Sequence, residues 1–365
     1  MANSRGLDRI REGMERALSV GIGSGMAASF GRIEDLVSGR PTAEIYVGRT
    51  SGFCGSDEVG SSTRFDLASL SKILGTTLLA MKQVEEGSLR LDEAPVPGRP
   101  FTWRQLLRHA SGLPAWRPFY EAMIGRFGTG LHSVPVEERA RFFFELLDQV
   151  GQESEPGERI VYSDLGFLHL GRALSADLES DVVSLWGRAP GVGLHYRSVS
   201  HSAMEERLAI QARGESVTMT EICPWRGPLV GLVHDDNCFT LGGVGGHAGV
   251  FGTLPDLLAW IGALFRGAFV SMRTIREFAT PWSDGQGGRR ALGFDCPAQD
   301  GSGSTGFAFS PDSIGHLGFT GTSLWMDPVN GHYAVLLTNR VHPTREDNRI
   351  RVFRRAFHEE LRNHL

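Results

Sequence analysis

Two runs of alternating apolar residues near the C-terminus, 322–327 and 332–339, are joined by Pro-Val-Asn-Gly. Alternation with a period of two is typical of strands, and the turn residues between the runs predict a β-hairpin. Two further short segments of β-like character lie near the N-terminus, at 26–33 and 43–47. Strand signals at both ends of the chain predict one antiparallel sheet that is assembled from both termini.

Helical spacing of apolar residues covers 7–18, 69–86 and 345–365, so a helix is expected in each of these segments. The clearest pattern, 69–86, is followed by Gly87, a residue suited to the left-handed conformation after a helix. Between about 100 and 230 the pattern is mostly helical. The predicted fold class is therefore α+β, a central antiparallel sheet flanked by terminal helices with a mostly helical inserted region.

The composition is that of a globular protein, with 41% hydrophobic and 22% charged residues. The 37 basic residues are dispersed and are outnumbered by 42 acidic ones, so no nucleic acid partner is expected. We see no leader and no apolar stretch long enough to span a bilayer, which predicts a cytoplasmic protein without a membrane partner. The four cysteines lack metal-ligand spacing and are expected to be buried thiols; neither a metal nor a cofactor is predicted. The oligomeric state is left open.

A serine and a lysine open the clearest helix. Ser69 and Lys72 are three residues apart, a spacing that places both side chains on one helical face. A serine hydroxyl is a weak nucleophile until a neighbouring base takes its proton, and a desolvated lysine can serve or support that base. Lys72 and Lys82 are the only lysines among the 37 basic residues, so this amine stands in a background of arginine. A Ser-x-x-Lys motif also arises by chance, and further motifs are needed.

Three ordered motifs supply them. Ser69-Leu70-Ser71-Lys72 is followed by Tyr162-Ser163-Asp164, similar to a Tyr-x-Asn motif, and then by His316-Leu317-Gly318, similar to a Lys-Thr-Gly strand. In this order and at these separations the chain resembles the penicillin-recognising serine hydrolases, which include class C β-lactamases, penicillin-binding proteins, D-aminopeptidases and related esterases.

The resemblance implies the β-lactamase/transpeptidase-like fold, with the site between a five-stranded antiparallel sheet and a helical region. We expect a single catalytic domain over 1–365. Its sheet region would cover about 1–65 and 235–365, and its helical region about 66–234.

The resemblance also implies a role for each matching residue. Ser69 is expected to be the nucleophile that becomes acylated, Lys72 to ease removal of its proton, and Tyr162 to act as general base or proton shuttle. The backbone N–H groups of Ser69 and Phe319 would form the oxyanion hole. Gly318 would leave room for substrate to pair along the strand edge.

Two departures from the family pattern affect the expected specificity at the substrate-binding wall. Asp164 stands where Asn is usual, and its carboxylate could pair with Lys72. His316 and Leu317 replace Lys and Thr, which removes a fixed positive charge and a hydroxyl that would bind a substrate carboxylate. Esterase-like and peptidase-like members often carry a histidine there, so this pattern favours a hydrolase of small esters, amides or D-residue peptides.

Two other segments are weaker candidates. Residues 234–237, His-Asp-Asp-Asn, could supply metal ligands, but a loop turn is the preferred interpretation because no further ligand falls at a useful spacing. The glycine-rich segment 242–249 is expected to pack closely behind the site, with His247 hydrogen-bonded inside that packing. Two functional alternatives stay open: a true class C-type β-lactamase, and a catalytically silent relative that binds a muropeptide or a partner protein.

Overall fold

The computed structural model describes residues 4–40 and 42–364 of the 365-residue chain. A five-stranded antiparallel sheet forms its framework, and Met26 of the first strand lies opposite Thr338 near the chain's end. In sheet order its strands are β10 (Ile314–Leu317), β11 (Ser323–Asp327), β12 (His332–Thr338), β1 (Gly25–Arg32) and β2 (Ala43–Gly48). The predicted hairpin and the predicted sheet built from both termini are confirmed, with β10 as one edge strand.

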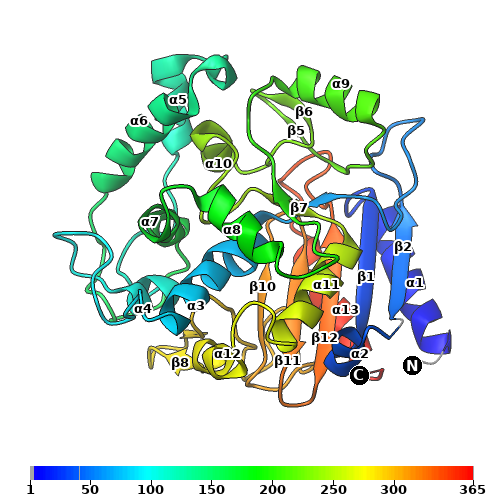
Figure 1. Ribbon diagram of the computed structural model, residues 1–365. Helices are drawn as coiled ribbons and strands as arrows, with labels where there is room; N and C mark the ends of the chain where they lie inside the picture. Colours follow the sequence, from blue (N-terminus) through cyan, green and yellow to red (C-terminus); the bar gives the residue numbers. More distant parts are fainter. Residues whose placement is uncertain (1–3, 41, 365) are drawn as a thin grey trace.

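Each face of this sheet is covered by helices. Helices α1 (Ser4–Ser19) and α13 (Ile350–Leu361) pack on one face, while α2 (Ile33–Ser38) and α11 (Leu254–Phe265) pack on the other (Figure 1). Strand alternation produces this division. Ala28 joins the core under α1 and α13, whereas its neighbour Ala27 joins the core under α11.

The helical region lies beside the sheet (Figure 1). The helices outside the two sheet-covering layers are α3 (Leu78–Glu85), α4 (Trp103–Leu107), α5 (Phe119–Phe127), α6 (Val136–Asp148), α7 (Asp164–Leu174), α8 (Leu178–Trp186), α9 (Ala203–Arg213), α10 (Asp236–Leu241) and α12 (Met272–Ala279). Short strands are also present: β3 (Phe65–Asp66), β4 (His195–Tyr196), β5 (Met219–Cys223), β6 (Gly227–Val230), β7 (Val250–Gly252), β8 (Trp282–Ser283) and β9 (Arg289–Arg290). The region expected to be mostly helical therefore also contains the β5–β6 hairpin.

Three local expectations were wrong. The helix expected over 345–365 begins only at Ile350, as α13. Arg340 donates hydrogen bonds to the backbone carbonyls of Arg345 and Asp347, which keeps these residues in the preceding loop. In the segment 234–237, which was expected to be a loop turn, His234 and Asp235 do lie in the loop, but Asp236 and Asn237 begin α10, because the Asp235 carboxylate accepts the Cys238 N–H at 2.7 Å and caps the helix. Cys54 is exposed, in contrast to the buried Cys238.

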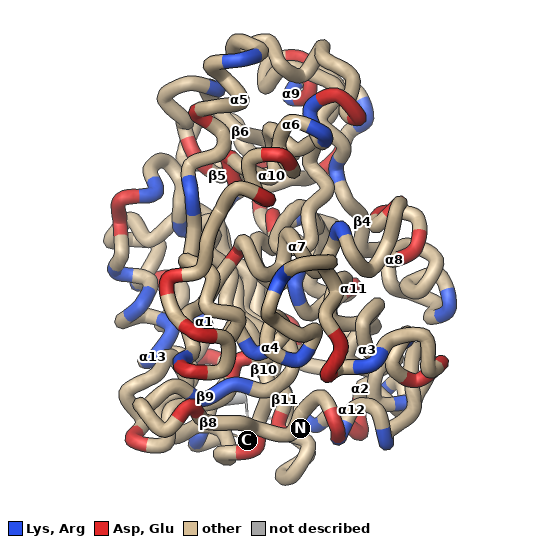
Figure 2. Tube along the Cα trace, turned by 90° about the vertical axis from the view of Figure 1, so that its left-hand side faces the viewer, with Lys and Arg blue, Asp and Glu red and all other residues tan. Residues whose placement is uncertain are grey.

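Charged residues of both signs are interspersed over the trace (Figure 2). Among the helices of residues 4–40 and 42–364, none combines the length and the apolar character that a bilayer crossing requires.

We predict that acid weakens the fold through His358, which lies fully buried in α13. Burial lowers the pKa of His358 to about 4. Between the ordinary pKa of about 6.5 and this value, the unfolded chain binds a proton that the folded chain does not, so stability falls as the pH falls. The loss from this residue between pH 7 and 4.5 should be roughly 2–3 kcal/mol, measured by urea unfolding.

The variant His358→Gln should lose less stability than the wild-type protein over the same pH interval. His201→Gln, at a half-exposed histidine, serves as the matched control. Equal pH dependence in the wild-type protein and His358→Gln would contradict the prediction.

Candidate active site

Ser69 lies on a tight turn that is stabilised by hydrogen bonds from the residues around it. Ala68, the preceding residue, has a φ of +48°, a left-handed conformation that is strained for a non-glycine residue. Its N–H donates to the Asp66 carboxylate at 2.8 Å, and its carbonyl accepts the Ser71 hydroxyl at 2.6 Å. These hydrogen bonds maintain the strained turn. Backbone strain that is held by surrounding contacts is typical of a functional site.

The predicted helix over 69–86 is confirmed in outline, with a change in its winding. A 3₁₀ turn at Ala68–Leu70 leads into a wider π-helical turn at Lys72–Thr77 and then into α3. Such wide turns are frequent at functional sites. Gly87 has the predicted positive φ, +74°.

Three predicted site residues meet at one hydroxyl. Ser69 Oγ lies 3.0 Å from Lys72 Nζ and 2.9 Å from Tyr162 OH. Tyr162 reaches this point from the loop before α7, where Ser163 caps the helix by accepting the Gly166 N–H. A hydroxyl, an amine and a phenol therefore converge from segments about ninety residues apart.

Lys72 is fully buried and is surrounded by acceptors. Its ammonium donates to Asp164 Oδ1 at 2.7 Å and to the His247 carbonyl at 3.1 Å. Burial acts to lower the pKa of Lys72, but the carboxylate of Asp164 outweighs it and leaves the pKa above its usual value. Lys72 is therefore a cation at neutral pH, paired with Asp164 as the sequence suggested.

Tyr162 is a neutral phenol in the resting site. Burial raises the pKa of Tyr162, and the positive charge of Lys72 offsets this only in part. The ring is bordered by cations on two sides, with Lys72 Nζ at 4.9 Å and the Arg290 guanidinium at 5.2 Å from its centroid. These cations favour negative charge that develops on the phenol during a reaction.

His316 differs chemically from the lysine that it replaces. Its Nδ1–H donates to the Leu317 carbonyl at 2.8 Å, so Nε2 carries a bare lone pair. Burial and the nearby charge of Lys72 hold the pKa of His316 well below its usual range. Nε2 is buried and has no partner among residues 4–40 and 42–364, so His316 offers a neutral acceptor to the site.

The predicted oxyanion donors are available. Within the described part of the chain, neither the Ser69 N–H nor the Phe319 N–H donates to another group. Two side chains connect the segments that carry them: Thr320 Oγ1 donates to the Asp66 carbonyl at 2.7 Å, and Thr322 Oγ1 to the Leu67 carbonyl at 3.2 Å. Fixed amides of this kind can stabilise an oxyanion without reorganising.

Gly318 is required by the close approach of these two segments. A Cβ at Gly318 would lie 2.0 Å from Thr322 Oγ1 and 2.8 Å from the Leu67 carbonyl. The glycine therefore lets the end of β10 approach the Ser69 turn closely. The outer edge of β10 beyond Gly315, which pairs with Asp295, faces the cavity.

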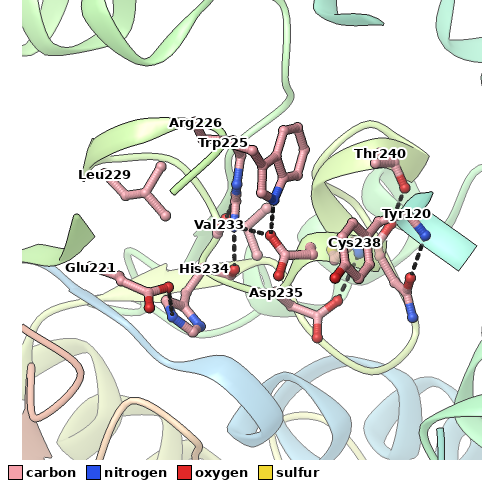
Figure 3. Close-up of polar contacts among 12 residues, drawn as sticks. Tyr120, Glu221, Trp225, Arg226, Leu229, Val233, His234, Asp235, Cys238 and Thr240 are labelled. Carbon is pink, nitrogen blue, oxygen red and sulfur yellow. Dashed lines mark hydrogen bonds and ion pairs between the residues drawn. The ribbon is translucent and has the colours of Figure 1, made fainter. Parts of the chain in front are cut away.

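Some residues that shape the site could hardly be recognised from the sequence. Asp66 joins the Ser69 turn to the His234 backbone N–H, which its second oxygen accepts at 2.7 Å. His234 in turn stacks on Phe319, with centroids 5.5 Å apart, and pairs with Glu221 at 3.1 Å (Figure 3). Only the proximity of Asp66 to the Ser-x-x-Lys motif could have suggested its role, whereas the Glu221 contact is purely tertiary.

The glycine-rich segment 242–249 packs closely, as predicted. A Cβ at Gly246 would lie 2.1 Å from the Phe167 carbonyl. His247 is hydrogen-bonded through Nε2 to Asp235 at 3.0 Å. Over residues 4–40 and 42–364, no group of three His, Cys, Asp or Glu side chains is arranged to hold a metal.

One cavity of about 810 Å³ lies at this site. The volume is in the range of sites for small organic ligands. Its walls include the nucleophile candidate, the outer edge of β10 and the start of α13. The lining residues predicted from the sequence are Ser69, Tyr162, Asp164, His316, Gly318 and Phe319.

Comparison with known proteins identifies the family. The family model described as Beta-lactamase matches residues 32–177 and 186–358. The chain belongs to this family, so the resemblance seen in its motifs is confirmed. It has the β-lactamase/transpeptidase-like fold and is a serine hydrolase.

Individual relatives differ in what their names describe. A protein of Escherichia coli K12 provisionally named D-alanyl-D-alanine carboxypeptidase is 26% identical over 320 residues, which cover 77% of this chain and 70% of the relative. A penicillin-binding protein from Bacillus halodurans has a TM-score of 0.63 at 20% identity, covering 93% of this chain and 95% of its own. EstCE1, a hydrolase with promiscuous acyltransferase activity, has a TM-score of 0.67 at 17% identity, with 97% and 98% covered. The two solved structures establish the shared fold.

We predict that Gly318→Ala impairs catalysis more than binding. The new Cβ would force Thr322 or the Leu67 carbonyl aside and displace the Phe319 N–H. Loss of one oxyanion donor should lower kcat for p-nitrophenyl acetate by about 10²-fold, with a smaller change in KM. Gly125→Ala in α5, where a Cβ meets nothing within 4 Å, is the matched control. A kcat for Gly318→Ala equal to that of Gly125→Ala would refute this role.

Proposed function

We propose that Ser69 is the nucleophile that carries the acyl group in this serine hydrolase. The observation that supports the proposal most directly is the approach of both Lys72 Nζ and Tyr162 OH to Ser69 Oγ, at 3.0 and 2.9 Å. This is the nucleophile-and-base arrangement that covalent catalysis requires.

In the proposed acylation, Ser69 Oγ attacks the substrate carbonyl while its proton passes to Tyr162 oxygen. Tyr162 gives up its own phenolic proton to the leaving oxygen or nitrogen, so the phenol is neutral before and after the step. The Ser69 and Phe319 amides hold the oxyanion. Water then attacks the acyl-enzyme through the same proton transfer in reverse, and the acid product leaves. This shuttle agrees with the raised pKa of Tyr162, because it needs no resting phenolate.

Lys72 and Asp164 would support this transfer without changing their charges. The Lys72 ammonium donates to Ser69 Oγ and stabilises negative charge on serine or tyrosine oxygen. Asp164 keeps Lys72 protonated and fixed in place. We therefore assign Asp164 to the support of Lys72 instead of direct substrate binding.

The proposed substrates are small esters, amides or D-residue peptides. The carboxypeptidase-named and esterase-named relatives support these classes. Strong β-lactam turnover is the second candidate, and the neutral His316 is less suited to it than the lysine of the family motif. A silent binding protein is disfavoured by the complete set of Ser69, Lys72 and Tyr162.

We also propose that the whole chain works as one catalytic domain, since both the sheet edge and the helical region line the cavity. The cytoplasmic location and the lack of nucleic acid and membrane partners stay predictions from the sequence.

A substrate panel tests the proposal. The wild-type protein should hydrolyse p-nitrophenyl acetate and at least one D-amino-acid amide or peptide, and nitrocefin far more slowly. A fluorophosphonate probe should add one adduct on Ser69, observed by intact mass. Ser69→Ala should lose the adduct and all of these activities. Unchanged ester turnover in Ser69→Ala, or an adduct on another residue, would contradict the assignment.

Asp164→Asn tests the role of the buried ion pair. Without the carboxylate, burial should dominate and lower the pKa of Lys72. Because the proposed mechanism needs the Lys72 cation, the alkaline limb of kcat/KM should move to lower pH. Asp92→Asn, which removes an exposed partner of Arg104, is the control. An alkaline limb that does not move would show that Lys72 charge is not needed.

A further inference from the structure

The glycine-rich segment contains one side chain that can make hydrogen bonds. Residues 245–249 read Gly-Gly-His-Ala-Gly, so His247 carries the only polar side chain of this run. Glycine restricts the backbone weakly, and the orientation of the peptide groups in such a run depends on what they contact. The contacts of His247 therefore have a large share in fixing this stretch of backbone.

The backbone carbonyl of His247 completes the surroundings of the Lys72 ammonium. An ammonium group has three N–H donors. Lys72 Nζ lies 3.0 Å from Ser69 Oγ, 2.7 Å from Asp164 Oδ1 and 3.1 Å from the His247 carbonyl oxygen, so each donor has one acceptor. Because the three donors are fixed relative to one another, the acceptors at Asp164 and His247 determine where the third N–H points. A shift of the His247 carbonyl would turn that N–H away from Ser69 Oγ.

The side chain of His247 is held by a carboxylate. His247 is 1% exposed, and its Nε2–H donates to Asp235 Oδ1 at 3.0 Å. The same oxygen accepts the Cys238 N–H at 2.7 Å, at the start of α10 (Figure 3). The other ring nitrogen of His247, Nδ1, is buried and has no partner within residues 4–40 and 42–364. The contact with Asp235 is therefore the polar anchor of this ring.

The Asp235 carboxylate is ionised. Burial acts to raise the pKa of Asp235, but His247 and the Cys238 N–H outweigh it and leave the pKa below its usual value. Hydrogen bonds to an ionised acceptor are shorter and stronger than those between neutral groups. The ring of His247 is therefore held firmly.

Asp235 is itself connected to the turn that carries Ser69. Its neighbour His234 donates its backbone N–H to Asp66 Oδ2 at 2.7 Å. The other oxygen of Asp66 accepts the N–H of the residue before Ser69 at 2.8 Å. The Ser69 turn and the start of α10 are thus joined through one buried carboxylate.

We propose that Asp235 and His247 form a positioning pair that fixes the hydrogen bond from Lys72 to Ser69. The pair closes a ring of polar contacts, which runs from the Ser69 turn through Asp66, Asp235 and His247 to Lys72 and back to Ser69 Oγ. The inference rests on the proposed function, because it gives the pair a part in activating that nucleophile. In this role the pair acts through the His247 carbonyl instead of contacting the reacting atoms.

The segment has other attachments on either side of His247. Thr76 Oγ1 donates to the Gly246 carbonyl at 2.7 Å, and Cys238 Sγ donates to the Ala248 carbonyl at 3.4 Å. The segment therefore stays attached to the protein when the pair is broken, and variants of the pair are expected to fold. What is lost is the anchor of the residue whose carbonyl faces Lys72.

Two variants break the pair at different ends. Asp235→Ser keeps a side-chain oxygen that can cap α10 but is too short to reach His247. His247→Phe keeps the ring and removes its N–H. Each variant should lower kcat for p-nitrophenyl acetate, and the rate at which a fluorophosphonate labels Ser69, by at least about tenfold with a smaller change in KM. The double variant should be no slower than either single variant, because the two residues act as a unit.

The pH profile separates this role from a merely structural one. A hydrogen bond to an ammonium favours its protonated form, so displacement of the His247 carbonyl should lower the pKa of Lys72. The alkaline limb of kcat/KM should move to lower pH by about one unit in both variants. His247→Phe leaves the Asp235 charge in place, so a shift shared by both variants does not come from that charge. A weakened α10 alone would lower the activity without moving the limb.

The other titratable groups around Lys72 are unchanged in these variants. They come from the start of α7, the loop after α4, α10 and β10, and they are Asp164, Tyr162, His109, Cys238 and His316.

The control variants are matched in chemistry. Asp177→Ser changes another helix-capping aspartate, which accepts the Ser180 N–H at 3.1 Å at the start of α8, and should leave kcat and the pH profile at their wild-type values. Asp235→Asn is the conservative variant. Its amide oxygen can accept from both Cys238 and His247, so it should retain most of the wild-type kcat and the position of the alkaline limb.

Three results would overturn the inference. The first is a wild-type kcat and alkaline limb in both Asp235→Ser and His247→Phe. The second is a double variant whose kcat falls by the product of the two single effects. The third is a raised KM at unchanged kcat in Asp235→Ser, which would place Asp235 at the substrate instead.

Failure of the inference is distinguishable from failure of the proposed function. If the wild-type protein hydrolyses p-nitrophenyl acetate and is labelled on Ser69, but the variants behave like it, the positioning pair is wrong and the proposed nucleophile stands. If the wild-type protein shows neither ester turnover nor labelling, the proposed function fails, and the inference that rests on it fails too.

Discussion

The ion pair between Lys72 and Asp164 is the interaction on which the site depends. It joins the π-helical turn after Ser69 to the first turn of α7, and the Lys72 contact to the His247 carbonyl adds the glycine-rich segment. Separation of these three segments would leave a buried cation without a partner, which is strongly unfavourable. The same pair therefore favours the packed arrangement and supplies the positive charge beside Ser69 Oγ.

Neighbouring side chains in the site differ in their charge. Lys72 is a cation, Tyr162 a neutral phenol and His316 a neutral imidazole, although all three lie close together. Burial acts on each group, and its effect is reversed only at Lys72, where a carboxylate lies 2.7 Å away. A histidine at the position of the family lysine thus changes the local charge as well as the side-chain shape.

Local patterns in the sequence predicted much of this architecture. The period-two alternation around β11 and β12 and the helical spacing after Ser69 report burial of one face, which is a local property. The meeting of Ser69, Lys72 and Tyr162 followed from a resemblance in motifs. The Asp66 contacts and the pairing of Asp235 with His247 could not be predicted, because they are tertiary contacts between residues that no local period relates. The start of α10 was missed because its cap is a single side chain within an acidic run.

The C-terminal helix α13 contacts the turn that carries one of the proposed oxyanion donors. Arg354 of α13 donates to the carbonyls of Gly321 and Thr322 and so holds the turn that presents the Phe319 amide. Strand β11, which follows that turn, pairs with β12, and β12 pairs with β1. Without α13 the candidate nucleophile, lysine and tyrosine would still be present, but the turn that carries the Phe319 amide would lose these hydrogen bonds. A substitution at Arg354 should therefore affect the proposed oxyanion donor from a distance, without touching Ser69.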